Sequence, residues 1–331
     1  MKGDDLMKKK QNIIITIMCL VLILSAGCAT KEDNSLKDTS ETVLSGDIGE
    51  YMDYVDKTVE GFEPYYNIVF AFENLPKGFL DFPSSDIQDM YEDIRKTFDY
   101  DIVSTQPLSY RGTYTGDKCY VDGYDAEKDN SKECINVASY DYDGNQYTET
   151  PLKTVMLGED TFGKFDDKIQ IGRNLQKEDF LLNSRTDKIK VVLGNNYINT
   201  YKIGDVIKLD LVAYPMSFEV VGFYKPNVSL KMDVEAQKKV EFDNAIIIPH
   251  LFFNYEPEGE DERFQHIFLT GEKISGFIKI EEDINDIDEK TFERYEDQMK
   301  NIAEKYELSD LYVMPYRPVG FVWDSNVQYN E

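Results

Sequence analysis

Two stretches of this chain each combine short apolar runs with an amphipathic helical pattern. In the first stretch, residues 66–72 form an apolar, β-prone run, and residues 101–104 show a second strand pattern. Between them, residues 85–98 have helical periodicity. One face of this helix would carry Ile87, Tyr91, Ile94 and Phe98. The pattern therefore predicts a strand, a helix and a strand in that order.

The same arrangement returns near the C-terminus. Residues 276–280 and 311–314 predict strands on either side of a helix over residues 288–306. The apolar face of that helix would carry Phe292, Tyr295, Met299, Ile302 and Tyr306. Each helix has one apolar stripe to bury, so we expect both βαβ units to pack as one layer pair with the helices on one side of a sheet.

The residues between these two units are rich in strand and turn patterns. Residues 137–142 and 146–150 flank Asp143-Gly144-Asn145, which indicates a β-hairpin. Further strands are predicted at residues 189–193, 206–212, 218–224 and 245–248. The fold class is therefore α+β, with a β-rich subdomain inserted between the two βαβ units.

The N-terminus has the three zones of a secretory signal. Lys8, Lys9 and Lys10 precede an apolar run over residues 13–24, and small residues follow up to Cys28. A small-residue triplet ending at a cysteine resembles a bacterial lipobox, which implies cleavage before Cys28 and a lipid on its thiol. An uncleaved membrane helix over residues 13–29 is the alternative. In both cases we expect a chain anchored in the cell membrane with an extracytoplasmic body.

These patterns divide the chain into four parts. Residues 1–27 form the signal peptide, and the polar residues 28–45 form a flexible tether. Residues 46–111 and 263–331 together form the subdomain of βαβ units. Residues 112–262 form the inserted β-rich subdomain. A second apolar run of 18 residues is absent from the sequence, so we expect no later membrane span.

The chain is strongly acidic, with a formal charge of −27. Nucleic-acid phosphates and anionic lipid headgroups would repel such a surface, which argues against nucleic acid as a partner. The acidic runs over residues 256–263 and 281–288 are interpreted as solvated loops or helix starts. An acidic docking face for a basic peptide or protein is the alternative.

Two cysteines, Cys119 and Cys134, lie in the predicted folded part. In an exported chain they are candidates for a disulfide that closes the loop between them. A pair of free thiols is the alternative.

The sequence offers little support for catalysis or metal binding. Asp141-Tyr142-Asp143-Gly144 resembles the start of a calcium loop but lacks the closing glutamate. His250 and His266 have no second ligand at zinc spacing, so we expect them at a surface or an interface. Neither a Gly-x-Ser-x-Gly motif nor a phosphate-binding Gly-Lys-Ser/Thr loop is present. We therefore expect no catalytic residue, metal or cofactor.

Spaced glycines carry the most specific pattern of the chain. Gly172-Arg173 precedes a short acidic segment, Gly194 ends a strand, and Gly204-Asp205 forms a turn before the next strand. The complete set is Gly172, Arg173, Asp179, Gly194, Gly204, Asp205, Gly222 and Pro249. In this order and spacing the residues resemble the extracytoplasmic core domain of MacB/FtsX-type ABC transporter permeases. Physically, the glycines suit turns and close backbone approaches, so we expect structural roles for them.

The resemblance implies a two-part domain that works without catalysis in transport. Its partners would be an ABC permease complex, another envelope protein or an exported peptide. In whole permeases three membrane helices follow this domain and couple it to an ATPase, and this sequence reaches Glu331 without them. A solute-binding lipoprotein with a cleft between the subdomains is the alternative function. A carboxylate hydrolase is a third hypothesis, which requires two facing carboxylates in a cleft.

Overall fold

The computed structural model describes residues 61–74, 84–106, 108–112, 114–124, 138–142, 145–212, 214–232 and 238–323. The signal peptide, Cys28 and the tether over residues 28–45 lie outside these residues and stay predictions, as does the role of Cys134. In the described part, no helix is both long enough and apolar enough to cross a membrane.

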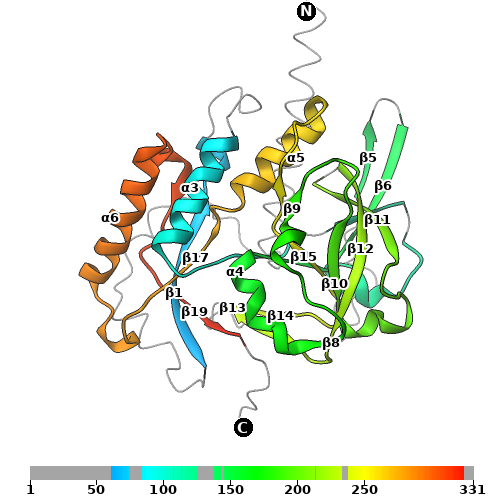
Figure 1. Cartoon of the computed structure of the whole chain (residues 1–331), viewed down its shortest axis with the longest axis horizontal. Coiled ribbons are helices and arrows are strands. Elements are labelled where there is room, and N and C mark those ends of the chain that lie inside the picture. The colour runs from blue at the N-terminus through cyan, green and yellow to red at the C-terminus, as the bar shows by residue number, and fades with distance from the viewer. Residues whose placement is uncertain are drawn as a thin grey trace, which may run out of the picture. The chain divides into compact units, whose positions relative to one another are not determined.

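Both ends of the described chain contribute strands to one antiparallel sheet, the first sheet (Figure 1). Its order is β14-β13-β19-β1-β17-β2, and β18 also pairs with β1. The strands are β1 (Phe62–Phe70), β2 (Tyr100–Asp101), β13 (Ser229–Met232), β14 (Lys238–Glu241), β17 (Gly276–Lys279), β18 (Tyr312–Val313) and β19 (Val319–Val322). Because β17 separates β1 from β2 and β1 separates β17 from β18, the two predicted βαβ units are confirmed and interleave in one sheet.

Helices α3 (Ser84–Thr97) and α6 (Glu289–Lys305) cover one face of the first sheet. Their predicted apolar stripes are buried against alternate residues of β1, among them Tyr66 and Ile68. Helix α6 begins after Asp288, whose carboxylate accepts a hydrogen bond from the Thr291 backbone N–H at 2.9 Å. The predicted helices and their side of the sheet are therefore confirmed.

The opposite face of the first sheet packs on the inserted subdomain. Tyr65, Phe277 and Phe321 point to this face, and they belong to or pack on the same core as residues of the second sheet. Successive side chains of a strand point to opposite faces, so β1 serves both cores. The inserted subdomain is therefore not a separate module, because part of its core comes from the first sheet.

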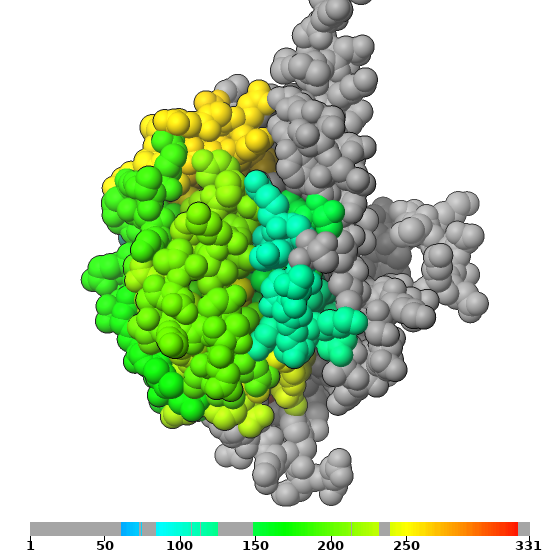
Figure 2. Space-filling view, turned by 90° about the vertical axis from the view of Figure 1, so that its right-hand side faces the viewer, coloured from blue at the N-terminus to red at the C-terminus, as the bar shows by residue number. Residues whose placement is uncertain are grey.

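The second sheet has ten strands among the described residues, in the order β3-β7-β15-β10-β12-β11-β4-β6-β5 with β8 on β12. They are β3 (Val103–Ser104), β4 (Leu108–Arg111), β5 (Ala138–Tyr142), β6 (Asn145–Leu152), β7 (Thr154–Leu157), β8 (Ile169–Gly172), β10 (Ile189–Leu193), β11 (Val206–Leu211), β12 (Tyr214–Tyr224) and β15 (Ile246–Pro249). The predicted hairpin is confirmed by the pairing of β5 with β6, although its turn residues Asp143 and Gly144 lie outside the described part. Figure 2 shows strands of this subdomain (green) with α5 (Gly259–Gly271, yellow) above them and the chain around β4 (blue-green) beside them.

The predicted strand over residues 101–104 is divided between the two sheets, which corrects the predicted boundary at residue 112. Asp101 ends β2 in the first sheet, and Val103 begins β3 in the second. Between them, the Ile102 N–H donates to Thr161 Oγ1 at 2.9 Å and its carbonyl accepts from the Gly158 N–H at 3.0 Å. The chain therefore enters the inserted subdomain at Ile102.

Helix α5 was not predicted, because its sequence has no single apolar stripe. Gln265, His266 and most of its other residues in the second half are buried. A helix that is buried on several sides lacks the amphipathic period that marks a surface helix. The short strands β9 (Leu181–Leu182) and β16 (Phe252–Phe253) form a separate two-stranded parallel sheet.

Two glycines allow β8 and β12 to approach closely. Gly172 pairs with Gly222, and a Cβ added to Gly222 would lie 2.2 Å from the Arg173 carbonyl oxygen. Gly172 has a positive φ of 78°, and a Cβ there would lie 2.3 Å from the Val221 carbonyl oxygen. Only glycine fits both positions without a shift of the backbone.

We predict that Gly222→Ala lowers the free energy of unfolding by about 1–3 kcal/mol, because the methyl group forces β8 away from β12. Urea unfolding of the full-length chain in detergent measures the change. Gly163→Ala is the matched control, since Gly163 has a helical φ of −58° and its Cβ would meet nothing within 4 Å. Equal unfolding midpoints for the two variants would contradict the close approach of β8 and β12.

Candidate functional site

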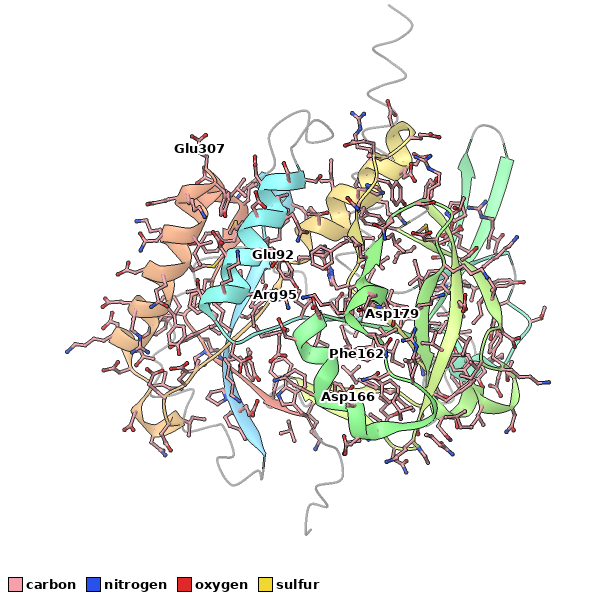
Figure 3. All side chains as sticks on the ribbon, viewed as in Figure 1. Glu92, Arg95, Phe162, Asp166, Asp179 and Glu307 are labelled. Carbon is pink, nitrogen blue, oxygen red and sulfur yellow. The ribbon has the colours of Figure 1, made fainter. Side chains whose placement is uncertain are left out.

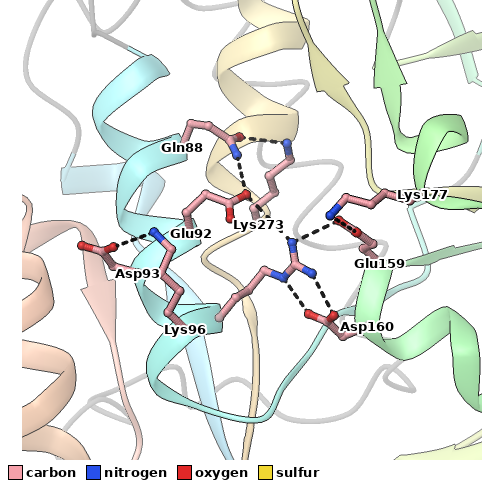
Figure 4. Close-up of polar contacts among 9 residues, drawn as sticks. Gln88, Glu92, Asp93, Lys96, Glu159, Asp160, Lys177 and Lys273 are labelled. Atoms are coloured by element: carbon pink, nitrogen blue, oxygen red, sulfur yellow. Dashed lines mark hydrogen bonds and ion pairs between the residues drawn. The ribbon is translucent and has the colours of Figure 1, made fainter.

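The two subdomains meet where the last turns of α3 face the start of α4 (Glu159–Phe162). In Figure 3, Glu92 and Arg95 lie on the side of α3 that faces α4. We call this polar contact the seam. It comprises Gln88, Glu92, Arg95, Glu159, Asp160, Lys177 and Lys273, which Figure 4 shows together.

Arg95 is the centre of the seam. Its Nε and Nη2 lie 2.6 and 2.8 Å from the two carboxylate oxygens of Asp160, and its Nη1 lies 3.1 Å from Glu159 Oε2. Such a bidentate, charge-assisted contact is stronger than a single neutral hydrogen bond. The Arg95 side chain is 15% exposed, and its hydrogen bonds to Asp160 raise its pKa. One cation of the first subdomain thus binds two carboxylates of the second.

Lys273 is buried behind this ion pair. Its Nζ donates to Gln88 Oε1 at 3.1 Å and lies 3.1 Å from the centre of the Phe252 ring. No carboxylate among the described residues lies within ion-pair distance of it, and Lys273 is 1% exposed. Burial lowers the pKa of Lys273 well below its ordinary value. The seam therefore contains an amine with only a neutral hydrogen-bond acceptor.

Both histidines are buried, so the prediction of surface or interface positions was wrong. His250 is 1% exposed, and neither ring nitrogen has a hydrogen-bond partner among the described residues. Burial and then the charge of Lys273 lower the pKa of His250 to about 3. His266 stacks on Phe253 with ring centres 3.8 Å apart, and burial lowers its pKa to about 4. His250 follows the buried strand β15, and His266 lies on the unpredicted helix α5.

A second polar contact joins the same two subdomains. Lys164 Nζ, from the 3₁₀ segment η4 (Gly163–Lys168), lies 2.9 Å from Asp101 Oδ2 at the end of β2. Lys164 also lies 4.4 Å from the centre of the Trp323 ring. The Asp101 side chain is fully buried, and burial raises its pKa although Lys164 opposes the shift. This ion pair links η4 to the end of β2.

The residues of the spaced-glycine pattern lie within the inserted subdomain. Arg173 binds both carboxylate oxygens of Asp179 at 2.5 and 3.1 Å. Asp179 also accepts from the Gln176 N–H at 2.8 Å, which closes the 3₁₀ segment η5 (Lys177–Phe180). Together with Gly172 and Gly222, this pair forms one structural cluster around β8 and β12.

The other pattern residues lie apart from that cluster or at its edge. Gly204 has a φ of 89°, and Asp205 accepts from the Lys202 N–H at 2.8 Å in the turn before β11. A Cβ on Gly194 would lie 1.8 Å from the Phe242 carbonyl oxygen, and Pro249 ends β15. The expected use of these glycines in turns and close approaches is confirmed. None of the pattern residues belongs to the seam.

Cys119 is half-buried in the 3₁₀ segment η3 (Lys118–Tyr120). Burial and then Asp117 raise the pKa of its thiol to about 11, so the thiol is protonated at neutral pH. Cys134 lies outside the described residues, and the disulfide between them stays a prediction. Within the described part, no group of three His, Cys, Asp or Glu side chains could hold a metal ion.

The residues of the seam were not identified from the sequence. The partners of Arg95 are 64 and 65 residues away along the chain, and 30% of all residues are charged. An ion pair between distant segments has no local signature in such a composition. Lys273 likewise has no motif around it.

No protein-family model, curated protein or solved structure matches this chain.

We predict that Lys164→Met lowers the free energy of unfolding by about 3–5 kcal/mol at neutral pH, because it leaves the Asp101 carboxylate buried and unpaired. Urea unfolding across a pH series measures this. Because the pKa of Asp101 is raised in the folded state, the folded state binds its proton more tightly than the unfolded state does. The loss of stability in Lys164→Met is therefore largest where Asp101 is ionised, and it shrinks as the pH falls and Asp101 becomes protonated.

The double variant Asp101→Asn with Lys164→Met should recover most of the loss, since no buried charge remains. Lys177→Met is the matched control, because Lys177 is 82% exposed in its pair with Glu159. A loss in Lys164→Met that is independent of pH and not recovered in the double variant would contradict this assignment.

Proposed function

We propose that this chain is a membrane-tethered, extracytoplasmic domain similar to the core domain of MacB/FtsX-type permeases. It acts without catalysis, by docking an envelope protein or exported peptide in association with an ABC permease complex. The observation that carries the proposal is the strand order β18-β1-β17-β2, in which both chain ends interleave around a β-rich insertion. The resemblance in the sequence implies this two-part layout.

The positions of the pattern residues support the same proposal. Gly172 and Gly222 allow a close approach of strands, Gly204 supports a turn with positive φ, and Arg173 with Asp179 closes a short acidic segment. These are backbone requirements that a shared fold would impose on shared positions. The sequence resemblance therefore concerns the architecture of the inserted subdomain and not a substrate site.

The mechanism that we propose is mechanical. The two subdomains share one apolar core on one side of the first sheet and meet through ion pairs at the seam. Ion pairs that are partly exposed can exchange protein partners for water at modest cost, whereas an apolar core cannot. Movement at the seam would then change the surface that a partner contacts, with the N-terminal anchor holding the domain near the membrane.

Exposed apolar side chains give positions at which docking can be tested. In the described part, Val69 and Val313 form a directly paired couple on β1 and β18 and are 42% and 45% exposed. Ile203 is 48% exposed and lies beside Gly172. Such side chains are common contact points in protein interfaces when they occur together.

We predict that a photo-crosslinking amino acid at Val69 or Ile203 of the full-length protein forms an adduct with an envelope protein or exported peptide in intact cells. Mass spectrometry of the adduct identifies the partner. Lys300 is the control position, because it is 61% exposed on the outer side of α6. Recovery of the free chain alone from every position would count against docking, and a melting temperature raised by a small molecule would favour the solute-binding alternative.

A further inference from the structure

Two parts of the seam favour opposite arrangements of the subdomains. Arg95 is held by three hydrogen bonds to Asp160 and Glu159, and these bonds exist only while α3 and α4 are in contact. We call this set of bonds the latch. The Asp160 side chain is 47% exposed, so water can reach the latch and compete for its partners.

Lys273 favours the opposite arrangement. An ammonium group has three donors, and the closed seam offers Lys273 the Gln88 amide oxygen and the face of the Phe252 ring. In water the amine would be fully hydrated and charged. The buried ring of His250 would likewise gain hydrogen-bond partners that it lacks among the described residues. Burial of these two groups is therefore unfavourable while the seam is closed.

We propose that the seam is a two-state device in which the latch holds the subdomains together and the burial of Lys273 and His250 favours their separation. The use of this device in docking rests on the proposed function, but the device itself is a property of the isolated chain. It would let a partner that contacts Asp160 or Glu159 release the latch and change the relative position of the subdomains.

The direction of the pH dependence follows from the groups around Lys273. The titratable groups that face Lys273 are Glu92, Arg95 and Tyr91 of α3, Glu159 of α4 and His250 after β15. Glu272 precedes Lys273 in the chain. Separation hydrates Lys273 and returns its lowered pKa to the ordinary value of about 10.4, so a proton is taken up on opening. Lower pH therefore favours the open state.

Two neighbouring groups limit the useful pH window. His250 would take up a further proton on opening only below its ordinary pKa of about 6.5. Burial raises the pKa of Glu272 to about 7, so opening would release a proton there at or below that pH and oppose the effect. Between about pH 7.5 and 9.5, Lys273 is the group among these that titrates on opening.

Hydrogen exchange at the backbone amides that connect the subdomains tests the proposal. The reporters are the Ile102 and Gly158 N–H groups, which bond to Thr161 Oγ1 and to the Ile102 carbonyl. In the full-length chain in detergent, we expect Arg95→Met to speed exchange at both reporters by about five- to thirtyfold. Lys273→Met should slow it by a similar factor, because an apolar side chain of similar length has nothing to hydrate.

The control is Lys305→Met, which removes the Lys305 ion pair with Asp93 on another side of α3 and should leave both reporters unchanged. Amides of β10 and β12 report global unfolding, so in the wild-type chain they should exchange more slowly than the two reporters. If Arg95→Met does not yield folded protein, Asp160→Asn tests the same latch with a milder change. After correction for chemical exchange, opening in the wild-type chain should rise as the pH falls within the window, and in Lys273→Met it should not.

Faster exchange in Lys273→Met, or reporters that exchange no faster than the amides of β10 and β12 in the wild-type chain, would overturn the two-state device. This experiment needs no partner. If crosslinking fails and the exchange pattern is as expected, the proposed docking is contradicted and the two-state device stands. If crosslinking succeeds and the exchange pattern is not as expected, only the two-state device is contradicted.

Discussion

Strand β1 is the constraint on which the structure depends. It pairs with β17 on one edge and with β18 and β19 on the other, so both ends of the described chain are fixed to it. Its alternating side chains serve two cores, with Tyr66 and Ile68 under the helices and Tyr65 in the core of the inserted subdomain. A shift of β1 by one residue would exchange these faces and expose both cores.

The seam follows from this arrangement. Because β2 lies at the edge of the first sheet and Ile102 passes the chain directly into the second sheet, α3 and α4 are brought to the same place. Charged residues fill this contact where the shared apolar core ends. The result is a junction with a rigid part, which is the common core, and a part built from ion pairs that can exchange with water.

The helices that could be predicted from sequence are those with a single buried face. Helices α3 and α6 each have one apolar stripe, and Asp288 marks the start of α6 with a local hydrogen bond. Helix α5 escaped prediction because it is buried on several sides. The break at Ile102 escaped prediction because residues 101–104 contain no glycine or proline that would mark it. Long-range pairing, such as β13 on β19, has no local signal.

The same physical distinction applies to the candidate site. Gly172, Gly204 and Gly222 were identifiable because a backbone conformation or a close approach restricts those positions to glycine. The bonds of Arg95 and the burial of Lys273 depend on residues that are distant in sequence, so they became visible only in three dimensions. For His250 and His266, the sequence shows the absence of metal partners but not the burial of the rings.

The shared sheet is the central claim, and a crosslink between its two chain ends tests it most directly. In a full-length chain with Cys119 and Cys134 replaced by serine, Val69→Cys and Val313→Cys would stand directly opposite each other on β1 and β18. Paired residues on neighbouring strands have the Cα separation that a disulfide requires. We predict that mild oxidation links the peptides containing residues 69 and 313, as detected by mass spectrometry. Full alkylation of both cysteines after oxidation would contradict the interleaved sheet and the function inferred from it.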